Sequence, residues 1–494
     1  MSSQPDNNTV YDIIVIGAGV VGPCIAKNMA RQGRKVLIAE REWNLPNRIV
    51  GELMQPSGLK ALRQLGMIKA INGIEAIEVD GYYIEFNGKE VTIDYPSKNV
   101  ESKLNNTPVP GAIKTGDEDK VGSDSTISAK KWEECPHVKG CAFRHGEFLT
   151  NLRDQCLSEP NVTKLDGNVT GLVKDDDQRV CGIKVADKGV FKGRLIVNCD
   201  GIYSKFRKEI GEDYVPTVGS YFVGMELIDA KMPRPNHGHV LLGKHAPVLL
   251  YQISPHQSRI LCAYRSKTLP KRNDVLQYLR ENVLPQLPKS LCPSFKAALE
   301  KDGQDIYRAM PNQYLTARLN NTPGFICIGD SLNMRHPLTG GGMTVGLNDA
   351  VMFCKMLSDV SNEDLADEEI VLEKMIDFHN ERKSLDVIIN TLSIALYTLF
   401  AADSKYLTIL QRGVFGYFLK GGLCIEEPIS LLSGLTPSIW TLFVNFFAVA
   451  FYACQLNFIA RGILGFPVAL FENIGVLITA AFVLLPLLLK EILS

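Results

Sequence analysis

"YDIIVIGAGVVGPCIAKNMARQGRKVLIAER" covers Tyr11 to Arg41 and decides the fold class of the chain. The run from Ile13 to Ile16 is apolar and mostly β-branched, which is typical of a strand buried on both faces of a parallel sheet. Gly17, Gly19 and Gly22 follow with the spacing G-x-G-x-x-G. The first permits a tight turn, the second lets a pyrophosphate approach, and the third allows close helix–strand packing. The stretch therefore predicts a Rossmann-like dinucleotide-binding unit.

An acidic residue ends the second predicted strand. Gly33 closes the expected helix, and a strand over Lys35–Ala39 runs into Glu40. Glu40 follows Gly22 at about the spacing at which a carboxylate binds the adenosine ribose of a dinucleotide. The motif alone leaves open whether the dinucleotide is FAD or NAD.

Two more apolar runs end on aspartate. A strand over Arg194–Cys199 leads into Asp200-Gly201, and we expect a helix after it that carries Ser204 and Arg207 on its first turns. "GFICIGDS" predicts a strand that runs into Asp330. Either stretch alone could be a capped strand–helix junction, because Asp-Gly is a common turn pair.

A glycine cluster follows Asp330, at the start of another predicted helix. In "GDSLNMRHPLTGGGMTVGLNDA", Gly340, Gly341 and Gly342 are consecutive. Glycine in a helix costs about 1 kcal/mol relative to alanine, so the cluster needs a reason. It is either a plain connecting loop or a place where a ligand approaches the backbone closely.

Length and composition narrow the class of protein. A chain of 494 residues predicts two or three domains. The net charge of −1 gives no support for nucleic-acid binding. Twelve cysteines without a CxxC pair suggest neither a disulfide framework nor a metal site. The N-terminus lacks the pattern of a signal peptide.

The C-terminal region predicts a hairpin of two apolar helices. Pro428–Ala460 and Asn473–Leu489 contain no Asp, Glu, Lys or Arg, and Pro467 lies in the turn between them. Membrane association is the main interpretation, and a buried core hairpin is the alternative. The first helix is long enough to cross a core of about 30 Å. Because the second carries Glu472 and Pro486, an anchor that dips into one leaflet is equally consistent.

Taken together, the motifs resemble those of a known family. The glycine fingerprint, Asp200-Gly201 and the Gly-Asp pair at Asp330 resemble the three motifs of flavoprotein monooxygenases with the p-hydroxybenzoate hydroxylase fold. "NRIVGELMQPSG", "GYYIEF", "FRHGEFLTNLR", "DGIYSKFRKE", "MRHPLTGGGMTVGLND" and the apolar tail follow in the order seen in squalene epoxidases of the shorter fungal kind. Asn47 and Ser57 depart from the commoner Asp and Gly.

The resemblance implies a fold class and a domain plan. The fold is α/β, with a Rossmann-like FAD-binding domain of the p-hydroxybenzoate hydroxylase and glutathione reductase type. This domain is expected to be discontinuous, over residues 10–80, 137–212 and 312–395. A β-sheet substrate domain takes residues 81–136 and 213–311, with a polar insertion at 97–134. Residues 396–494 form a helical, membrane-associated region.

The resemblance also implies the site. FAD is the expected cofactor, and the residues expected to bind it are Gly17, Gly19, Val20, Val21, Gly22, Glu40, Arg41, Arg48, Arg153, Val169, Asp200, Asp330, Gly341, Gly342 and Met343. Asp330 falls on the ribityl chain, and the last three lie at the flavin edge that becomes negative on reduction. Tyr82 and Gln55 are expected above the flavin as catalytic residues, although Tyr82 could equally be a core aromatic. We expect His336 to be structural.

The implied reaction is the epoxidation of squalene to (S)-2,3-oxidosqualene in sterol (ergosterol) biosynthesis. Molecular oxygen and the reduced cofactor supply the oxygen atom, so no side-chain base or nucleophile is needed. Since the chain has a single GxGxxG, NADPH is expected to act through a membrane-bound NADPH–cytochrome reductase. The expected location is the cytosolic face of the endoplasmic reticulum membrane, with lipid droplets as a second location.

Two other functions share parts of this pattern. A membrane flavoprotein reductase that acts on another polyprenyl lipid would have the same fold and anchor. Non-enzymatic escort proteins bind prenylated partners on related folds without flavin. The complete glycine fingerprint, Glu40 and Asp330 favour a protein that binds its cofactor.

Overall fold

The N-terminal motif forms the predicted strand–turn–helix unit in the computed structural model, which describes residues 5–46, 48–97, 138–243, 246–301 and 306–494. β1 (Val10–Ile16) leads through the glycine turn into α1 (Val21–Arg31) and then β2 (Val36–Glu40). Every residue of β1 after Val10 is buried, as a central parallel strand requires.

The first sheet has seven strands around this unit. Its order is β8 (Val162–Asp166), β2, β1, β11 (Gly189–Asn198), β10 (Val180–Val185) and β9 (Val169–Lys174), with β17 (Phe325–Cys327) paired to β11. β8, β2, β1, β11 and β17 are mutually parallel where they pair. Their carboxyl ends therefore meet at one edge of the sheet, the edge at which ligands bind in open α/β sheets.

The helix expected after Asp200 is absent, and that prediction was wrong. Only two short 3₁₀ turns, Gly201–Tyr203 and Arg207–Glu209, are formed there. Ser204 between them has an extended ψ of 122°. The Nδ2 group of Asn198, at the end of β11, donates to the Ser204 hydroxyl at 3.0 Å and holds this extended segment against the strand end.

The second sheet also has seven strands and is mostly antiparallel. Its order is β16 (Arg308–Tyr314), β12 (Thr217–Ile228), β15 (Gln257–Tyr264), β14 (Val248–Ser254), β13 (His237–Leu242), β5 (Gly81–Phe86) and β6 (Lys89–Asp94). β16 crosses the domain boundary expected at residue 311. The predicted polar insertion lies outside the described residues, except for residue 97.

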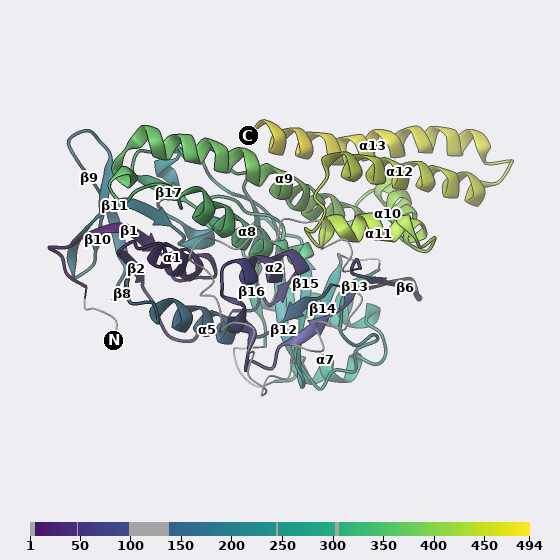
Figure 1. Cartoon of the computed structure of the whole chain (residues 1–494). Coiled ribbons are helices and arrows are strands. Elements are labelled where there is room, and N and C mark those ends of the chain that lie inside the picture. The colour runs from purple at the N-terminus through teal and green to yellow at the C-terminus, as the bar shows by residue number, and fades with distance from the viewer. Residues whose placement is uncertain (1–4, 47, 98–137, 244–245, 302–305) are drawn as a thin grey trace.

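Smaller elements complete these two layers. A three-stranded sheet joins β3 (Leu53–Met54), β7 (Gly140–Ala142) and β4 (Ile77–Val79). The main helices of the first layer are α2 (Pro56–Gln64), α5 (His145–Leu157) and α8 (Gly341–Met356). α6 (Arg272–Tyr278) and α7 (Cys292–Leu299) pack on the second sheet, on the side away from the hairpin in Figure 1.

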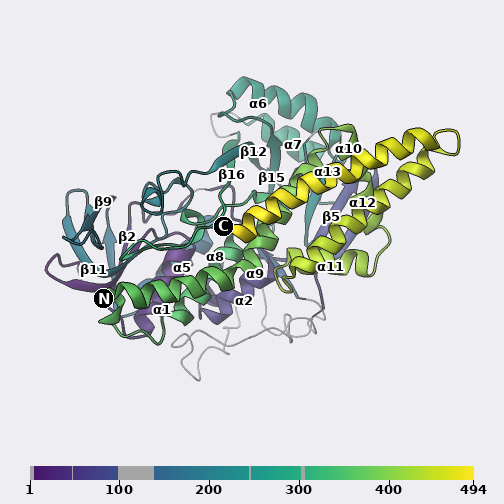
Figure 2. The ribbon, with the colours of Figure 1, turned by 90° about the horizontal axis from the view of Figure 1, so that it is seen from above.

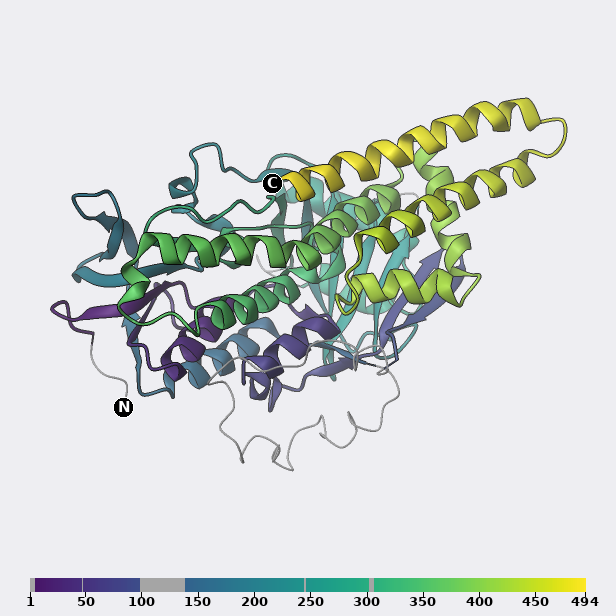
Figure 3. The same ribbon diagram turned by 45° about the horizontal axis from the view of Figure 1, so that its top comes forward.

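Five helices follow α8, and the last two form the predicted hairpin. They are α9 (Glu368–Ala401), α10 (Lys405–Phe418), α11 (Leu423–Leu432), α12 (Ile439–Arg461) and α13 (Phe466–Leu493). Figure 3 shows α12 and α13 side by side, with their turn projecting beyond the body of the molecule. The charge-free run from Pro428 includes the end of α11 as well as α12.

Three of these helices, α9, α12 and α13, are long and apolar enough to cross a membrane. Their surroundings differ. In the most apolar window of α9, 72% of the residues are buried, against 39% in α12 and 28% in α13. In Figure 1, α9 lies between α8 and α13, and the view from above in Figure 2 shows the hairpin extending away from the rest of the molecule. α9 is therefore a core helix, whereas the exposed apolar surface of the hairpin indicates membrane association.

Candidate functional site

One cavity of about 990 Å³ joins the two large sheets. Its walls include the carboxyl ends of β1, β2, β11 and β17 and one face of the second sheet. The cavity thus has a polar end, formed largely by backbone turns of the first layer, and an apolar end, formed by side chains of the second.

The N-terminal glycines shape the polar end. Gly17 has a φ of +98°, and a Cβ atom there would lie 2.6 Å from the carbonyl oxygen of Cys199. At Gly22 a Cβ atom would lie 2.0 Å from the carbonyl oxygen of Gly17. These two glycines are needed by the fold itself. Gly19 differs, because a Cβ atom there would meet no protein atom within 4 Å and would point into open space on the cavity wall.

Charged groups surround this turn. Ala18 N donates to the Glu40 carboxylate at 2.8 Å. The buried Arg153 donates from Nε to the Ala18 carbonyl at 2.9 Å and lies over the ring of Trp43. Glu40 and Arg153 both line the cavity, as does the exposed Arg48. One carboxylate and two cations thus face the space beside Gly19.

Two aspartates follow the strand ends. Asp200 accepts a hydrogen bond from Asn198 Nδ2 at 2.8 Å. Asp330 lies in a 3₁₀ turn after β17, and its carboxylate accepts no hydrogen bond from the described part of the chain. Burial raises the pKa of Asp330, and the nearby Arg335 is the largest opposing influence. A buried carboxylate without a donor is costly, so this one is suited to the hydroxyl groups of a ligand.

The consecutive glycines begin α8, as predicted. Gly340 has a φ of +62° and precedes the helix, and no side chain in the described part of the protein caps the free N–H groups that follow. At Gly341 a Cβ atom would lie 2.4 Å from Ile389 Cγ2, whereas at Gly342 it would meet nothing within 4 Å. Gly342 and Met343 line the cavity. The positive end of α8 therefore faces a space kept clear by Gly342.

The apolar end lies against the second sheet. Its wall includes Leu53, Tyr82, Leu249, Tyr251, Leu261, Met310, Pro311, Pro337 and Leu338. Gln55 is fully buried behind Tyr82: its Nε2 group donates to the Tyr82 hydroxyl and, at 2.6 Å, to the Thr339 carbonyl, while its Oε1 accepts from Tyr95 at 2.6 Å. Burial raises the pKa of Tyr82 to about 12, so the phenol stays protonated.

Most residues expected at the site meet around this one cavity. Those on its wall are Gly17, Gly19, Val20, Val21, Glu40, Arg41, Arg48, Tyr82, Arg153, Val169, Asp200, Asp330, Gly342 and Met343. Gly22, Gln55 and Gly341 lie behind the wall and support it. His336 is buried, accepts from Leu338 N at 3.2 Å and stacks on Tyr397 at 4.0 Å, which are contacts that hold the loop together.

Sequence reasoning missed three titratable groups on the wall. Arg335 lines the cavity beside Asp330. His145 donates to the Gly51 carbonyl at 2.9 Å, and burial lowers its pKa to about 4. Glu52 forms a buried ion pair with Arg259 at 2.7 Å. The sequence gives no signal for these groups, because nothing in a single sequence distinguishes a buried titratable side chain from a solvated one.

The polar end fits the phosphate, ribityl and ring parts of FAD. Gly19 and Gly342 leave open space where side chains would block a ligand, and the Asp330 carboxylate accepts no hydrogen bond within the described ranges. Arg48 and Arg153 supply positive charge for a pyrophosphate. The pattern of clear space, an unpaired acid and two cations is what a flavin dinucleotide requires.

The chain matches a family model described as squalene epoxidase over residues 192–471. The squalene epoxidase of Candida albicans is 52% identical over 493 residues, which cover 98% of this chain and 99% of that protein. That of Saccharomyces cerevisiae is also 52% identical and covers 99% of this chain and 97% of its own length. The squalene monooxygenase of Mus musculus is 35% identical and covers 97% and 78%.

Solved structures share the fold at low identity. The flavin-dependent brominase Bmp2 aligns with a TM-score of 0.66 at 14% identity, over 90% of this chain and all of that one. The p-nitrophenol 4-monooxygenase PnpA of Pseudomonas putida aligns with a TM-score of 0.64 at 16% identity, over 87% and 98%. These similarities confirm the predicted fold class.

Proposed function

The chain belongs to the squalene epoxidase family, and from this premise we propose that it epoxidises squalene to (S)-2,3-oxidosqualene in sterol (ergosterol) biosynthesis. The observation that carries the proposal is the cavity that joins a dinucleotide-binding turn to an apolar wall. A flavin held at the first end would present its ring toward a hydrocarbon held at the second.

The polar end would hold FAD through the chain's own groups. In this assignment the Gly17–Gly22 turn receives the pyrophosphate, and Glu40 binds the ribose. Arg48 and Arg153 lie near the phosphates and flavin, and Asp330 binds the ribityl hydroxyls. When bound and reduced, FAD reacts with molecular oxygen and supplies one oxygen atom to the alkene, while the other leaves as water.

The apolar end would position the alkene and exclude water. Squalene has no polar group, so its recognition depends on shape and on burial of its surface. The wall offers leucine, methionine, proline and tyrosine side chains. Tyr82 and Tyr251 bring hydroxyl groups to this wall, and Gln55 fixes that of Tyr82 at the boundary between the two ends. The protein thus contributes orientation and a dry site, and no nucleophile or base is required.

The electrons are proposed to come from NADPH through a partner, the NADPH–cytochrome reductase of the same membrane. The chain has only one GxGxxG, and that motif is assigned to FAD. The cytosolic face of the endoplasmic reticulum is the proposed location, since the exposed hairpin would bring both proteins to one surface.

A reconstituted reaction tests this function. Purified protein with FAD, the reductase, NADPH, oxygen and squalene should give a product heavier by one oxygen atom, as measured by mass spectrometry. In stopped-flow absorbance, NADPH alone should leave the flavin oxidised, and the reductase should bleach it. An oxygen-independent product would instead indicate a polyprenyl reductase. A colourless protein that takes up no flavin would indicate an escort protein.

A further inference from the structure

Arg335 is a buried cation on the cavity wall that forms no ion pair with a carboxylate of the described residues. Its side chain is 8% exposed. The guanidinium donates to the Asn333 carbonyl at 3.2 Å, to the Asn333 side-chain oxygen, and to the Gly341 carbonyl at 3.4 Å, while its Nε has no partner among the described residues. Asp330 influences its pKa, yet the two side chains form no ion pair.

Two other buried arginines have their charge balanced in ways that Arg335 does not. Arg382 forms ion pairs with Asp349 at 2.7 Å and with Asp386 at 2.6 Å. Arg34 lies at the opposite end of α8, where it donates to the Leu357 and Val360 carbonyls. That end of a helix is negative, so it stabilises a cation.

Arg335 lies at the other end of the same helix. The N-terminus of α8 begins at Gly341 and carries partial positive charge, so it adds to the guanidinium charge instead of balancing it. Burying an unpaired charge is costly unless a partner of opposite sign is supplied. Arg335 and the N-terminus of α8 therefore both place positive charge at this wall, where Asp330 is the carboxylate that acts most strongly on Arg335.

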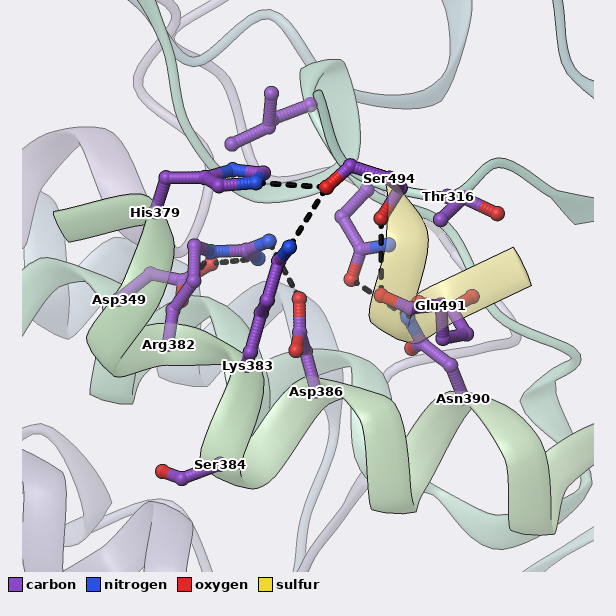
Figure 4. A network of polar contacts seen from close by, with 12 residues as sticks. Thr316, Asp349, His379, Arg382, Lys383, Ser384, Asp386, Asn390, Glu491 and Ser494 are labelled. Atoms are coloured by element: carbon purple, nitrogen blue, oxygen red, sulfur yellow. Dashed lines mark hydrogen bonds and ion pairs between the residues drawn. The ribbon is translucent and has the colours of Figure 1, made fainter. Parts of the chain in front are cut away.

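A chain of hydrogen bonds fixes the guanidinium in this place. Asn333, which holds Arg335, donates to the Leu315 carbonyl at 2.8 Å. Asn390 of α9 donates to the Asn333 side-chain oxygen at 3.3 Å and to Glu491 of α13 at 2.9 Å. Figure 4 shows Asn390 and Glu491 pointing toward each other, beside the Arg382 cluster. Residues of α9 and α13 thus help to hold the Arg335 guanidinium in position, although neither helix belongs to the first sheet and its covering helices.

We propose that Arg335 is the fixed positive charge that stabilises the reduced, anionic form of the flavin at the N-terminus of α8. The inference rests on the proposed binding of FAD in this cavity. Oxidised flavin is neutral in its ring, so the charge of Arg335 stabilises the reduced form more and raises the reduction potential of the bound cofactor.

The test is the reduction potential of the bound flavin, measured by spectroelectrochemistry on the full-length protein in detergent. Arg335→Gln should weaken binding of reduced flavin at least tenfold more than binding of oxidised flavin, which lowers the two-electron potential by about 30 mV. Arg335→Lys keeps the charge and should show a smaller shift. A wild-type potential in flavin-replete Arg335→Gln overturns the proposal.

Arg207→Lys is the matched control. Arg207 is also buried and donates to the carbonyls of Asp330 and Ser331 in the same turn, but it is not on the cavity wall. The control should lower flavin content without lowering the potential of the flavin that remains. An equal fall in potential in this control would mean that disturbance of the turn, and not the charge, is responsible.

Asn333→Asp keeps the proposal testable if Arg335→Gln does not fold. This nearly isosteric change removes the donation to the Leu315 carbonyl and adds a carboxylate against the guanidinium, so the potential should again fall. An unchanged potential in Asn333→Asp overturns the proposal. Failure of the wild-type protein to bind any flavin would instead overturn the proposed function, so the two failures are distinct.

Discussion

The two ends of the cavity are built in different ways. At the polar end, backbone turns define the space: Gly17 and Gly22 permit the close packing of the strand–turn–helix unit, while Gly19 and Gly342 leave room for a ligand. At the apolar end, side chains from several strands and loops define it, and few positions have a steric constraint as severe. Backbone geometry restricts the sequence to glycine, whereas an apolar wall accepts many combinations of side chains.

The largest expected effect separates two glycines of the same motif. Gly22→Ala places a methyl group against the Gly17 carbonyl. It should lower the free energy of unfolding of the apoprotein by about 3 kcal/mol or more, since overpacking typically costs about 1–3 kcal/mol. Gly19→Ala should leave the unfolding of the apoprotein within about 0.5 kcal/mol of wild type and yet weaken FAD binding. Urea unfolding and flavin titration measure the two effects. Equal destabilisation by both changes would contradict the division.

This contrast also explains what the sequence could reveal. The strand before Gly17, the turn after it and the start of α8 were predicted because their glycines form local patterns that can be read from the sequence. The helix predicted after Asp200 was wrong, because the Asn198 side chain holds Ser204 in an extended conformation. A contact of that kind is fixed by tertiary structure and leaves no periodic pattern in the sequence.

The three apolar helices give a second example. α9, α12 and α13 are all long and apolar enough to cross a membrane, and the sequence predicted the α12–α13 hairpin from its lack of charge. α9 is buried because it packs against α8 and α13, and the hydropathy of a helix does not show which neighbours it has in the fold. The position of Gln55 behind Tyr82, and of Arg335 on the wall, likewise depends on partners far away in the chain.

The next effect tests the unpaired acid of the polar end. Asp330→Ala should weaken FAD binding by about 1.5–3 kcal/mol, because the ribityl hydroxyls lose a charged acceptor. The apoprotein should not lose stability, since the carboxylate accepts no hydrogen bond from the described residues. Flavin absorbance and urea unfolding are the measurements.

Asp200→Ala is the contrasting variant. Asp200 accepts from Asn198, so its loss should destabilise the apoprotein as well as lower its flavin content. Full flavin content and normal turnover in Asp330→Ala would show that Asp330 does not bind FAD.

A smaller effect is expected at the turn of the hairpin. Leu464 is fully exposed, and Leu464→Ala should weaken partition into vesicles by about 2 kcal/mol, or roughly thirtyfold, if this turn enters the lipid. Leu269→Ala is the control, because Leu269 is also exposed but lies in the loop that connects β15 to α6, away from the hairpin in the sequence. Vesicle flotation measures both. Equal losses would show that the hairpin turn has no special contact with the membrane.

The smallest effect concerns the boundary between the two ends. Tyr82→Phe removes the acceptor of one of the two hydrogen bonds donated by Gln55 Nε2, while the bond to the Thr339 carbonyl remains. Because Gln55 Nε2 keeps its bond to the Thr339 carbonyl, only one hydrogen bond is lost, and the cost in stability should be about 1 kcal/mol. FAD content should not change, whereas the KM for squalene should rise.

Tyr251→Phe is the matched control on the same wall. No hydrogen bond to the Tyr251 hydroxyl is formed within the described residues, so the stability of this variant should match that of the wild type. If Tyr82→Phe instead lost flavin and kept its KM, Tyr82 would belong to the polar end, and the division of the cavity would have to be drawn on the other side of Gln55.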